Sequence, residues 1–148
     1  MKKILMILGG IFSIILIAAL SFFGYSAYVG NQYDASSKSY IEKTLPTILQ
    51  ADAASELVKY ASPQLVEVLD TKKGDIDFIF KKLTELGKFD KLTDLKGDAL
   101  ISITTQSGRI ITARYESKAI FEKGQISIVI NLINNAGQWQ ISRFHVNL

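Results

Sequence analysis

Acid–base chemistry in this chain would have to come from very few side chains. His145 is the only histidine, and it lies close to Arg143 near the C-terminus. From Ala99 onward the only carboxylates are Glu116 and Glu122, and Glu122 falls in the turn-like stretch EKGQ. His145, Arg143 and Glu116 could form an acid–base set, but a lone histidine near a C-terminus is more often a surface or packing residue. These residues predict a protein without catalysis.

Other common chemical centres are missing from the sequence. The chain has no cysteine, which excludes thiolate metal sites, cysteine nucleophiles, disulfides and lipidated cysteine anchors. It also has no histidine pair at ligand spacing, no nucleophile elbow and no phosphate-binding loop. We therefore predict no catalytic residues, no bound metal and no cofactor.

The positive net charge does not point to nucleic acid. The formal charge is +3, but Lys2 and Lys3 lie ahead of a long apolar segment. Residues 31–148 contain 15 of the 17 basic residues and all 14 acidic residues, so this part of the chain is almost neutral. Binding to a phosphate backbone needs concentrated basic charge. We predict no nucleic-acid partner.

The strongest signal is the apolar N-terminal segment. Residues 4–29 contain no charged residue, and about 20 apolar residues in a helix cross the hydrocarbon core of a bilayer. Because Lys2 and Lys3 precede the segment, the N-terminus should stay in the cytoplasm while the remainder is exported. The sequence predicts a membrane anchor over residues 1–30 and an exported domain over residues 31–148. We expect the inner membrane of a bacterium, with the C-terminal domain periplasmic or extracellular.

Two alternatives to an uncleaved anchor stay open. A cleaved signal peptide would use Gly24 and Ser26 as small residues before the cut, although the apolar run exceeds the roughly 7 to 15 residues of a signal-peptide core. The stretch LGGIFSIIL also resembles the processing region of type IV pilin precursors, in which the fifth mature residue is usually Glu and here is Ile15. The aromatic cluster between Phe22 and Tyr28 favours a retained anchor, because such residues gather at membrane interfaces.

Helical spacing follows the apolar segment. Apolar residues between Tyr33 and Leu49 form one stripe, and Pro46 predicts a kink or a new helix start nearby. A second helix is expected in the stretch ASELVKYA. Ser62 as N-cap with Pro63 at the first helical position predicts a third helix. A further helix should be capped by Asp75 and end at Gly87.

From Asp98 the pattern changes to alternation of apolar and polar residues. Breaks at QSGR, EKGQ and NNAGQ predict hairpin turns and an antiparallel meander of four strands. In the last strand, Trp139 and Ile141 share one face, whereas Phe144 and Val146 fall on the other, so we expect a bulge between them. The predicted fold class is α+β: an N-terminal transmembrane helix, then about three helices packed on a curved antiparallel four-stranded sheet.

Several stretches carry a family resemblance. They are LQADAASELVKYAS, IFKKLTELGKF, GRIITARYESKAIFEKGQISIVINL and WQISRFHV. In this order they resemble the cone-shaped, cystatin-like fold of the nuclear transport factor and ketosteroid isomerase superfamily, and within it small bacterial membrane-anchored or exported domains of unknown function. The superfold hosts enzymes, binding modules and assembly subunits. In its isomerases an acidic base, a tyrosine and a second acid share an apolar mouth, and neither Glu116 nor Glu122 matches that motif.

The resemblance implies a cavity between the sheet and the helices. Aromatic side chains could line it, with an arginine as a polar anchor, although each aromatic could equally pack in the core. The candidate cavity residues are Tyr60, Phe78, Arg114, Tyr115, Phe121 and Trp139.

Taken with the anchor, these features predict a non-catalytic accessory or interaction subunit of a bacterial cell-envelope assembly. Its partner would be a membrane protein or a second copy of the chain. The alternative is a module that binds a small molecule or peptide in the cone cavity. An isomerase-like enzyme is the third hypothesis.

Overall fold

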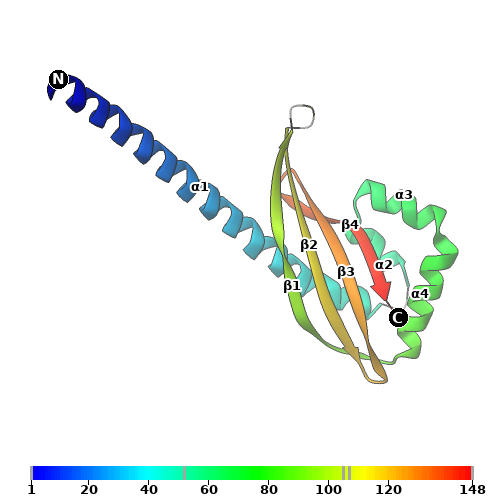
Figure 1. Ribbon diagram of the computed structural model, residues 1–148. Helices are drawn as coiled ribbons and strands as arrows, with labels where there is room; N and C mark the ends of the chain where they lie inside the picture. Colours follow the sequence, from blue (N-terminus) through cyan, green and yellow to red (C-terminus); the bar gives the residue numbers. More distant parts are fainter. Residues whose placement is uncertain (1, 52, 105, 107, 148) are drawn as a thin grey trace. The chain divides into compact units, whose positions relative to one another are not determined.

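Figure 1 shows the computed structural model, which describes residues 2–51, 53–104, 106 and 108–147. Side chains are described for these residues apart from 2–12, Phe23, Ser26, Ala27 and Thr104. The helices are α1 (Lys2–Leu49), α2 (Ser55–Tyr60), α3 (Pro63–Thr71) and α4 (Lys73–Glu85). The strands are β1 (Phe89–Thr104), β2 (Gly108–Phe121), β3 (Gly124–Asn135) and β4 (Gln138–Asn147). The chain divides into two compact units, Met1–Tyr33 and Asp34–Leu148.

The first unit exposes large apolar side chains around the helix. Ile14, Ile15, Leu16 and Ile17 are consecutive, and their exposed fractions lie between 47% and 69%. Successive helix residues are turned by about 100°, so these side chains point to every side of α1.

The predicted membrane-spanning helix can be compared with the length and hydropathy of the helices in the structure. Over the residues that the structure describes, none of the helices is both long and apolar enough to cross a bilayer. Part of the predicted anchor, including the side chains of residues 2–12, lies outside the described residues.

The second unit is an α+β domain with a four-stranded antiparallel sheet. The strand order is β1-β2-β3-β4, so every strand pairs with its neighbours in sequence. The predicted meander is thereby confirmed. Figure 1 shows α2, α3 and α4 on one side of this sheet, and the buried residues of α1 from Ile41 to Leu49 belong to the same core.

Two helix ends agree with the sequence prediction. The Ser62 hydroxyl accepts a hydrogen bond from the Leu65 N–H at 3.4 Å, and Pro63 occupies the first helical position of α3. The φ angle of Gly87 is 81° just beyond α4, a left-handed conformation that glycine adopts without a Cβ clash.

Two other helix boundaries differ from the prediction. Helix α1 continues through Pro46 to Leu49, so no new helix starts there. Pro46 has no N–H, so the helix loses one backbone hydrogen bond there. The burial of Leu45 and Ile48 against the core holds this turn of the helix in place. Helix α4 begins earlier than expected, and Asp75 lies in its first turn with no side-chain cap.

The first strand also begins well before its predicted start at Asp98, because β1 runs from Phe89. The pairing with β2 contains register shifts between Phe89 and Lys91 and between Thr93 and Lys96. An extra residue at a bulge interrupts the alternation of side chains. The period-two pattern is therefore absent from the stretch FDKLTDLKG, although it is a strand.

The bulge predicted in the last strand is confirmed. Leu132 pairs with Ile141, whereas Asn131 pairs with Arg143, so Ser142 is the extra residue. The Ser142 hydroxyl donates to the Asn131 carbonyl at 3.1 Å. After this bulge Phe144 and Val146 return to the face that Ile141 occupies.

Side chains fill the space between the sheet and the helices. Eleven of the core residues are at most 2% exposed: Ile41, Leu45, Ile48, Leu57, Phe80, Leu83, Ala119, Ile128, Ile130, Leu132 and Ile141. Close-packed interiors of this kind leave few voids larger than a water molecule. Hollows that could hold a ligand have to be sought at the rim of the core.

Candidate functional site

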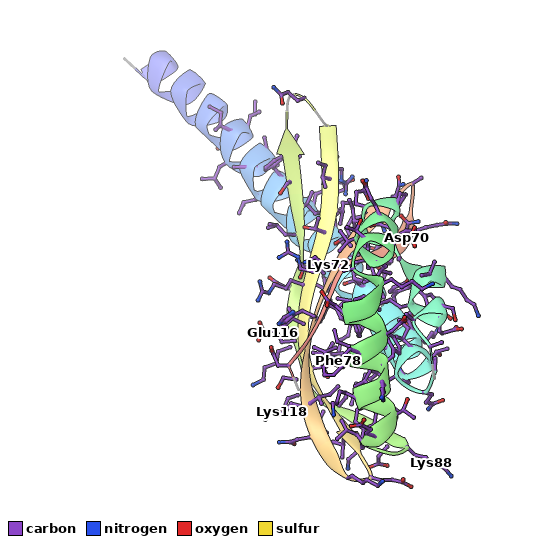
Figure 2. All side chains as sticks on the ribbon, turned by 90° about the vertical axis from the view of Figure 1, so that its right-hand side faces the viewer. Asp70, Lys72, Phe78, Lys88, Glu116 and Lys118 are labelled. Carbon is purple, nitrogen blue, oxygen red and sulfur yellow. The ribbon has the colours of Figure 1, made fainter. Side chains whose placement is uncertain are left out.

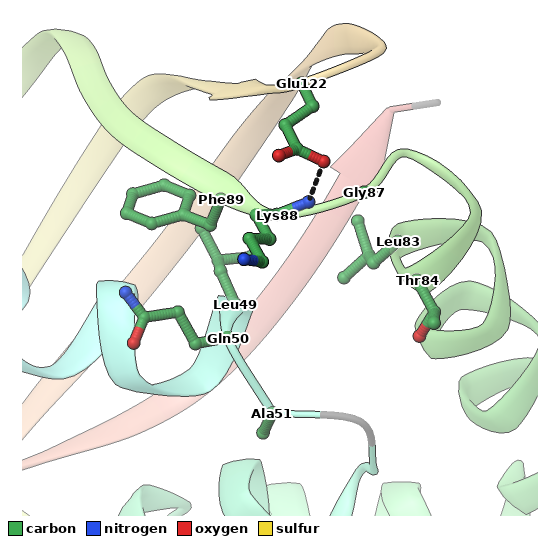
Figure 3. Close-up of a pocket in the computed structure, with 9 residues that line it drawn as sticks. All are labelled: Leu49, Gln50, Ala51, Leu83, Thr84, Gly87, Lys88, Phe89 and Glu122. Atoms are coloured by element: carbon green, nitrogen blue, oxygen red, sulfur yellow. Dashed lines mark hydrogen bonds between the residues drawn. The ribbon is translucent and has the colours of Figure 1, made fainter.

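A pocket of about 480 Å³ lies where α1, α4 and the start of β1 meet (Figure 3). Its apolar residues include Leu49, Leu83 and Phe89, and its polar residues include Gln50 and Lys88. The remaining lining residues are Ala51, Thr84, Gly87 and Glu122. We call this hollow the α1-end pocket.

The β2–β3 turn is joined to the segment after α4 by backbone and side-chain hydrogen bonds. The Glu122 N–H donates to the Lys88 carbonyl at 3.0 Å, and the Lys123 N–H donates to the Leu86 carbonyl at 3.0 Å. The Glu122 carboxylate accepts from the Lys88 N–H at 3.2 Å (Figure 3). A Cβ on Gly87 would lie 2.6 Å from that carboxylate, so a larger residue there would push the Glu122 side chain aside.

The α1-end pocket can bind a small amphipathic molecule. Leu49, Leu83 and Phe89 offer apolar contact, and the Gln50 amide and Lys88 ammonium can donate hydrogen bonds. Among the described residues that line it, Glu122 is the one carboxylate, and that group is held by a backbone N–H. Within this described part of the lining, general acid–base chemistry with two carboxyl groups lacks a second acid.

A second hollow brings together two of the predicted cavity residues, Tyr60 and Trp139. It has a volume of about 540 Å³ and also contains Tyr40, Lys43 and Lys59. The remaining lining residues are Ser36, Ser39, Gly137, Gln138 and Gln140. We call it the aromatic hollow. Aromatic faces flanked by lysines and amides can contact a polar ligand with an apolar surface.

The Trp139 indole and the Tyr40 hydroxyl at the aromatic hollow form hydrogen bonds with neighbouring side chains. The Trp139 indole N–H donates to the Ser36 hydroxyl at 3.0 Å. Burial raises the pKa of the Tyr40 hydroxyl, a hydrogen bond with Thr44 opposes that shift, and the nearby Tyr60 adds to it. The Tyr40 phenol therefore stays neutral at physiological pH.

Two further predicted cavity residues are part of the core. Phe121 is buried and makes an edge-to-face contact with Phe89, with the ring centroids 5.7 Å apart. Tyr115 is also buried, and its hydroxyl lies 2.9 Å from the Ser37 hydroxyl and donates to the Asp34 carbonyl at 3.2 Å. Burial raises the pKa of Tyr115, which the hydrogen bond with Ser37 partly offsets.

The last two predicted cavity residues lie on the surface. Phe78 is 56% exposed on α4, with the Lys82 ammonium 5.7 Å from its ring centroid. Figure 2 labels Phe78 on that helix. Arg114 lies on the sheet face opposite the helices and forms an ion pair with Glu116 at 3.0 Å. The predicted residues thus belong to the aromatic hollow, the core and two separate surfaces, and as a ligand site they stay a prediction.

The residues of the considered acid–base set are separated by a strand. Glu116 pairs with Val129, and Val129 pairs with His145. Strands lie about 4.8 Å apart, so the backbones of Glu116 and His145 are roughly 10 Å apart. His145 instead contacts the Asn147 amide oxygen at 3.0 Å. Within the described part of the chain, no group of three or more His, Cys, Asp or Glu side chains could hold a metal ion.

A polar cluster that joins α1 to the sheet was missed by the sequence reasoning. The Asp34 carboxylate accepts from the Ala99 N–H at 2.5 Å, and Ser37 is fully buried beside Tyr115. The stretch DASS was the available signal, because its small polar residues lie close to the apolar stripe of a helix.

The comparisons with known proteins add no relative. No protein-family model matches the chain, no curated protein is similar to it, and no solved structure matches its fold.

Proposed function

We propose that this protein is a membrane-anchored interaction subunit of a bacterial cell-envelope assembly and acts without catalysis. Its second unit would dock on a membrane protein or on another copy of the chain. We further propose that this unit has the cone-shaped, cystatin-like fold of the nuclear transport factor and ketosteroid isomerase superfamily, which its order of helices and antiparallel strands supports.

The anchor is supported by the sequence and by the exposed side chains of α1. Residues 4–29 carry no charge, and the apolar residues 14–17 are exposed on every side of the helix. A helix that is apolar all round is stable only where an apolar environment surrounds it. Lys2 and Lys3 favour a cytoplasmic N-terminus and an exported second unit in the inner membrane.

The non-catalytic role is supported by the packing of the second unit. Its interior is filled by side chains such as Phe80, Ile128 and Leu132. The considered acid–base residues Glu116 and His145 are exposed on the outer sheet face with β3 between them. The observation that carries the proposal is the combination of a filled core with an apolar N-terminal helix.

The alternative function, binding of a small molecule, is supported by the α1-end pocket. Its volume of about 480 Å³ and its lining by both apolar and polar residues suit a small amphipathic ligand. An isomerase-like enzyme is the weaker alternative, because the described residues of the lining include one carboxylate, Glu122.

Fractionation of bacterial cells tests the anchor. The full-length chain should stay in the membrane pellet after alkaline carbonate extraction. A variant in which a cleavable signal peptide replaces residues 1–30 should be soluble. Release of the full-length chain by carbonate would contradict the anchor.

Purification from native membranes in mild detergent tests the interaction. We expect one membrane protein, or a second copy of the chain, at a stoichiometric ratio to the full-length protein. Recovery of the full-length protein as a monomer that carries a small molecule would instead favour the ligand-binding alternative.

A further inference from the structure

Strands β1 and β2 extend beyond the rest of the sheet. The pairing of β1 with β2 continues to Thr104 and Gly108, whereas the pairing of β2 with β3 starts only at Ile111. The segments Ser102–Thr104 and Gly108–Ile110 therefore form a two-stranded ribbon, visible at one end of the sheet in Figure 1. We call these two segments, together with Leu100 and Ile101 at their base, the projecting ribbon.

The projecting ribbon carries exposed apolar side chains on both of its faces. Ile103 is 80% exposed and Leu100 is 63% exposed, and Ile101 and Ile110 are half-buried. Because neighbouring strand residues point to opposite faces, Leu100 lies on the face opposite to Ile101 and Ile103. Exposed apolar residues that gather in one place are typical of a contact with a protein or a membrane.

The ribbon lies at the end of the second unit where its chain begins. The Asp34 carboxylate accepts from the Ala99 N–H at 2.5 Å, which places the start of this unit beside β1 just ahead of the ribbon. At the other end of the unit, Leu49 and Phe89 line the same pocket. From Ala99 the strand extends about 13 Å further to Ile103.

Chain length limits how far this end can lie from the apolar segment. The uncharged stretch ends at Val29 and the second unit begins at Asp34. The few connecting residues reach at most about 20 Å even when fully extended. If residues 4–29 lie in a bilayer, the membrane surface is within reach of the projecting ribbon.

We infer that the projecting ribbon inserts its apolar side chains into the headgroup boundary of the bilayer that holds the N-terminal segment. This inference rests on the proposed membrane anchor. Lipid surrounds an inserted ribbon and covers both faces, which fits the apolar residues on each side, whereas a docked protein covers one. Arg109 is the single charged residue among residues 100–110, and a basic residue next to apolar ones suits an anionic headgroup layer.

The absence of cysteine from the chain allows a clean labelling experiment. Single cysteines would replace Ile103 in the ribbon, Ala18 in the apolar segment and Lys123 in the β2–β3 turn at the opposite end of β2. Each full-length variant would be labelled with the same environment-sensitive fluorophore and reconstituted into vesicles of phosphatidylethanolamine and phosphatidylglycerol. Quenching by spin-labelled lipid reports contact with the bilayer, and quenching by iodide reports contact with water.

We expect lipid quenching at positions 18 and 103, at least about twofold stronger at 103 than at 123. Strong quenching at 18 with equal, weak quenching at 103 and 123 would overturn the inference and leave the anchor intact. Weak lipid quenching at position 18 would overturn both. A probe at 103 that is shielded from iodide but not quenched by lipid would show that protein, not lipid, covers the ribbon, and that result also overturns the inference.

Discussion

The hydroxyl of Tyr115 joins two parts of the second unit at the scale of a single residue. It lies 2.9 Å from the Ser37 hydroxyl and 3.2 Å from the Asp34 carbonyl, so it connects β2 to the first turns that α1 contributes to this unit. These groups are removed from water, where each unmade hydrogen bond costs free energy. The tyrosine therefore fixes how this part of α1 lies on the sheet.

Replacing Tyr115 with Phe should lower the free energy of unfolding by about 1 to 2 kcal/mol, because Ser37 loses a buried partner. Urea unfolding of the second unit, followed by circular dichroism, measures the change. Tyr60→Phe is the matched control, since Tyr60 is half-buried at the rim of the open aromatic hollow. Equal effects of the two substitutions would show that the Tyr115 hydroxyl has no structural role.

The raised pKa of Tyr115 predicts a pH dependence of stability. Because burial favours the neutral phenol, the pKa of Tyr115 is higher in the folded state than in the unfolded chain. Its contribution is complete below about pH 10, where the unfolded tyrosine is neutral, and is lost as the pH rises towards the folded pKa. Tyr40 shifts in the same direction.

Unfolding free energies measured between pH 8 and pH 11 should therefore fall with rising pH, with a shallower slope for Tyr115→Phe than for the natural chain. Identical slopes would mean that Tyr115 titrates equally in the folded and unfolded states.

At the scale of elements, one residue in β4 decides which side chains enter the core. Ser142 is the extra residue between the pairs that Ile141 and Arg143 make with β3. If Ser142 were paired in the ladder and did not bulge, Arg143 and His145 would turn towards the helices and Phe144 towards solvent, because side chains alternate along a strand. The bulge allows both halves of β4 to present apolar residues to the same core.

Deletion of Ser142 should leave cooperative unfolding of the second unit intact, because without the extra residue Ile141 and Phe144 lie two positions apart and keep the same face in a regular ladder with β3. Ser142→Ala keeps the residue count and should cost only about 1 kcal/mol, the loss of one hydrogen bond to the Asn131 carbonyl. Thermal unfolding by calorimetry measures both variants. A deletion variant that loses cooperative unfolding, while Ser142→Ala keeps it, would disprove this account of the bulge.

Gly97 gives a second prediction at this scale. Its φ angle is 152°, and an added Cβ would collide with the Arg114 carbonyl oxygen and the backbone of Tyr115. Gly97→Ala should therefore destabilise the second unit by about 3 kcal/mol or more. Gly124→Ala, whose Cβ would lie 3.4 Å from Leu86, should change stability by less than about 0.5 kcal/mol. Chemical denaturation measures both, and a tolerated Gly97→Ala would contradict the close approach.

At the scale of the whole molecule, the proposed topology places the two ends of the chain on opposite sides of a membrane. A cysteine in place of Lys123 should react with a membrane-impermeant maleimide in intact spheroplasts, whereas a cysteine in place of Lys3 should react only after lysis. Labelling at position 3 alone before lysis would reverse the topology. Labelling at neither position in intact spheroplasts would place both the N-terminus and the second unit inside the cell.

Much of the second unit could be predicted because local patterns and tertiary packing agree there. Turn residues marked the hairpins, the N-cap at Ser62 marked α3, and the change of face between Ile141 and Phe144 marked the bulge. The early part of β1 was missed because its register shifts remove the alternation that identifies a strand. Of the two outcomes predicted at Pro46, a kink or a new helix start, the new start is not observed, because burial outweighs one lost hydrogen bond.

The sequence alone determined the α+β class, the order of four antiparallel strands and the uncharged N-terminal segment, because turn chemistry and hydropathy act over a few neighbouring residues. Only the tertiary structure separated the predicted cavity residues, with Tyr115 in the core, Trp139 at the aromatic hollow and Arg114 on the outer face. It also brought Asp34 to Ala99. An aromatic or polar residue type is compatible with a core, a pocket or a surface, and long-range contacts decide among them.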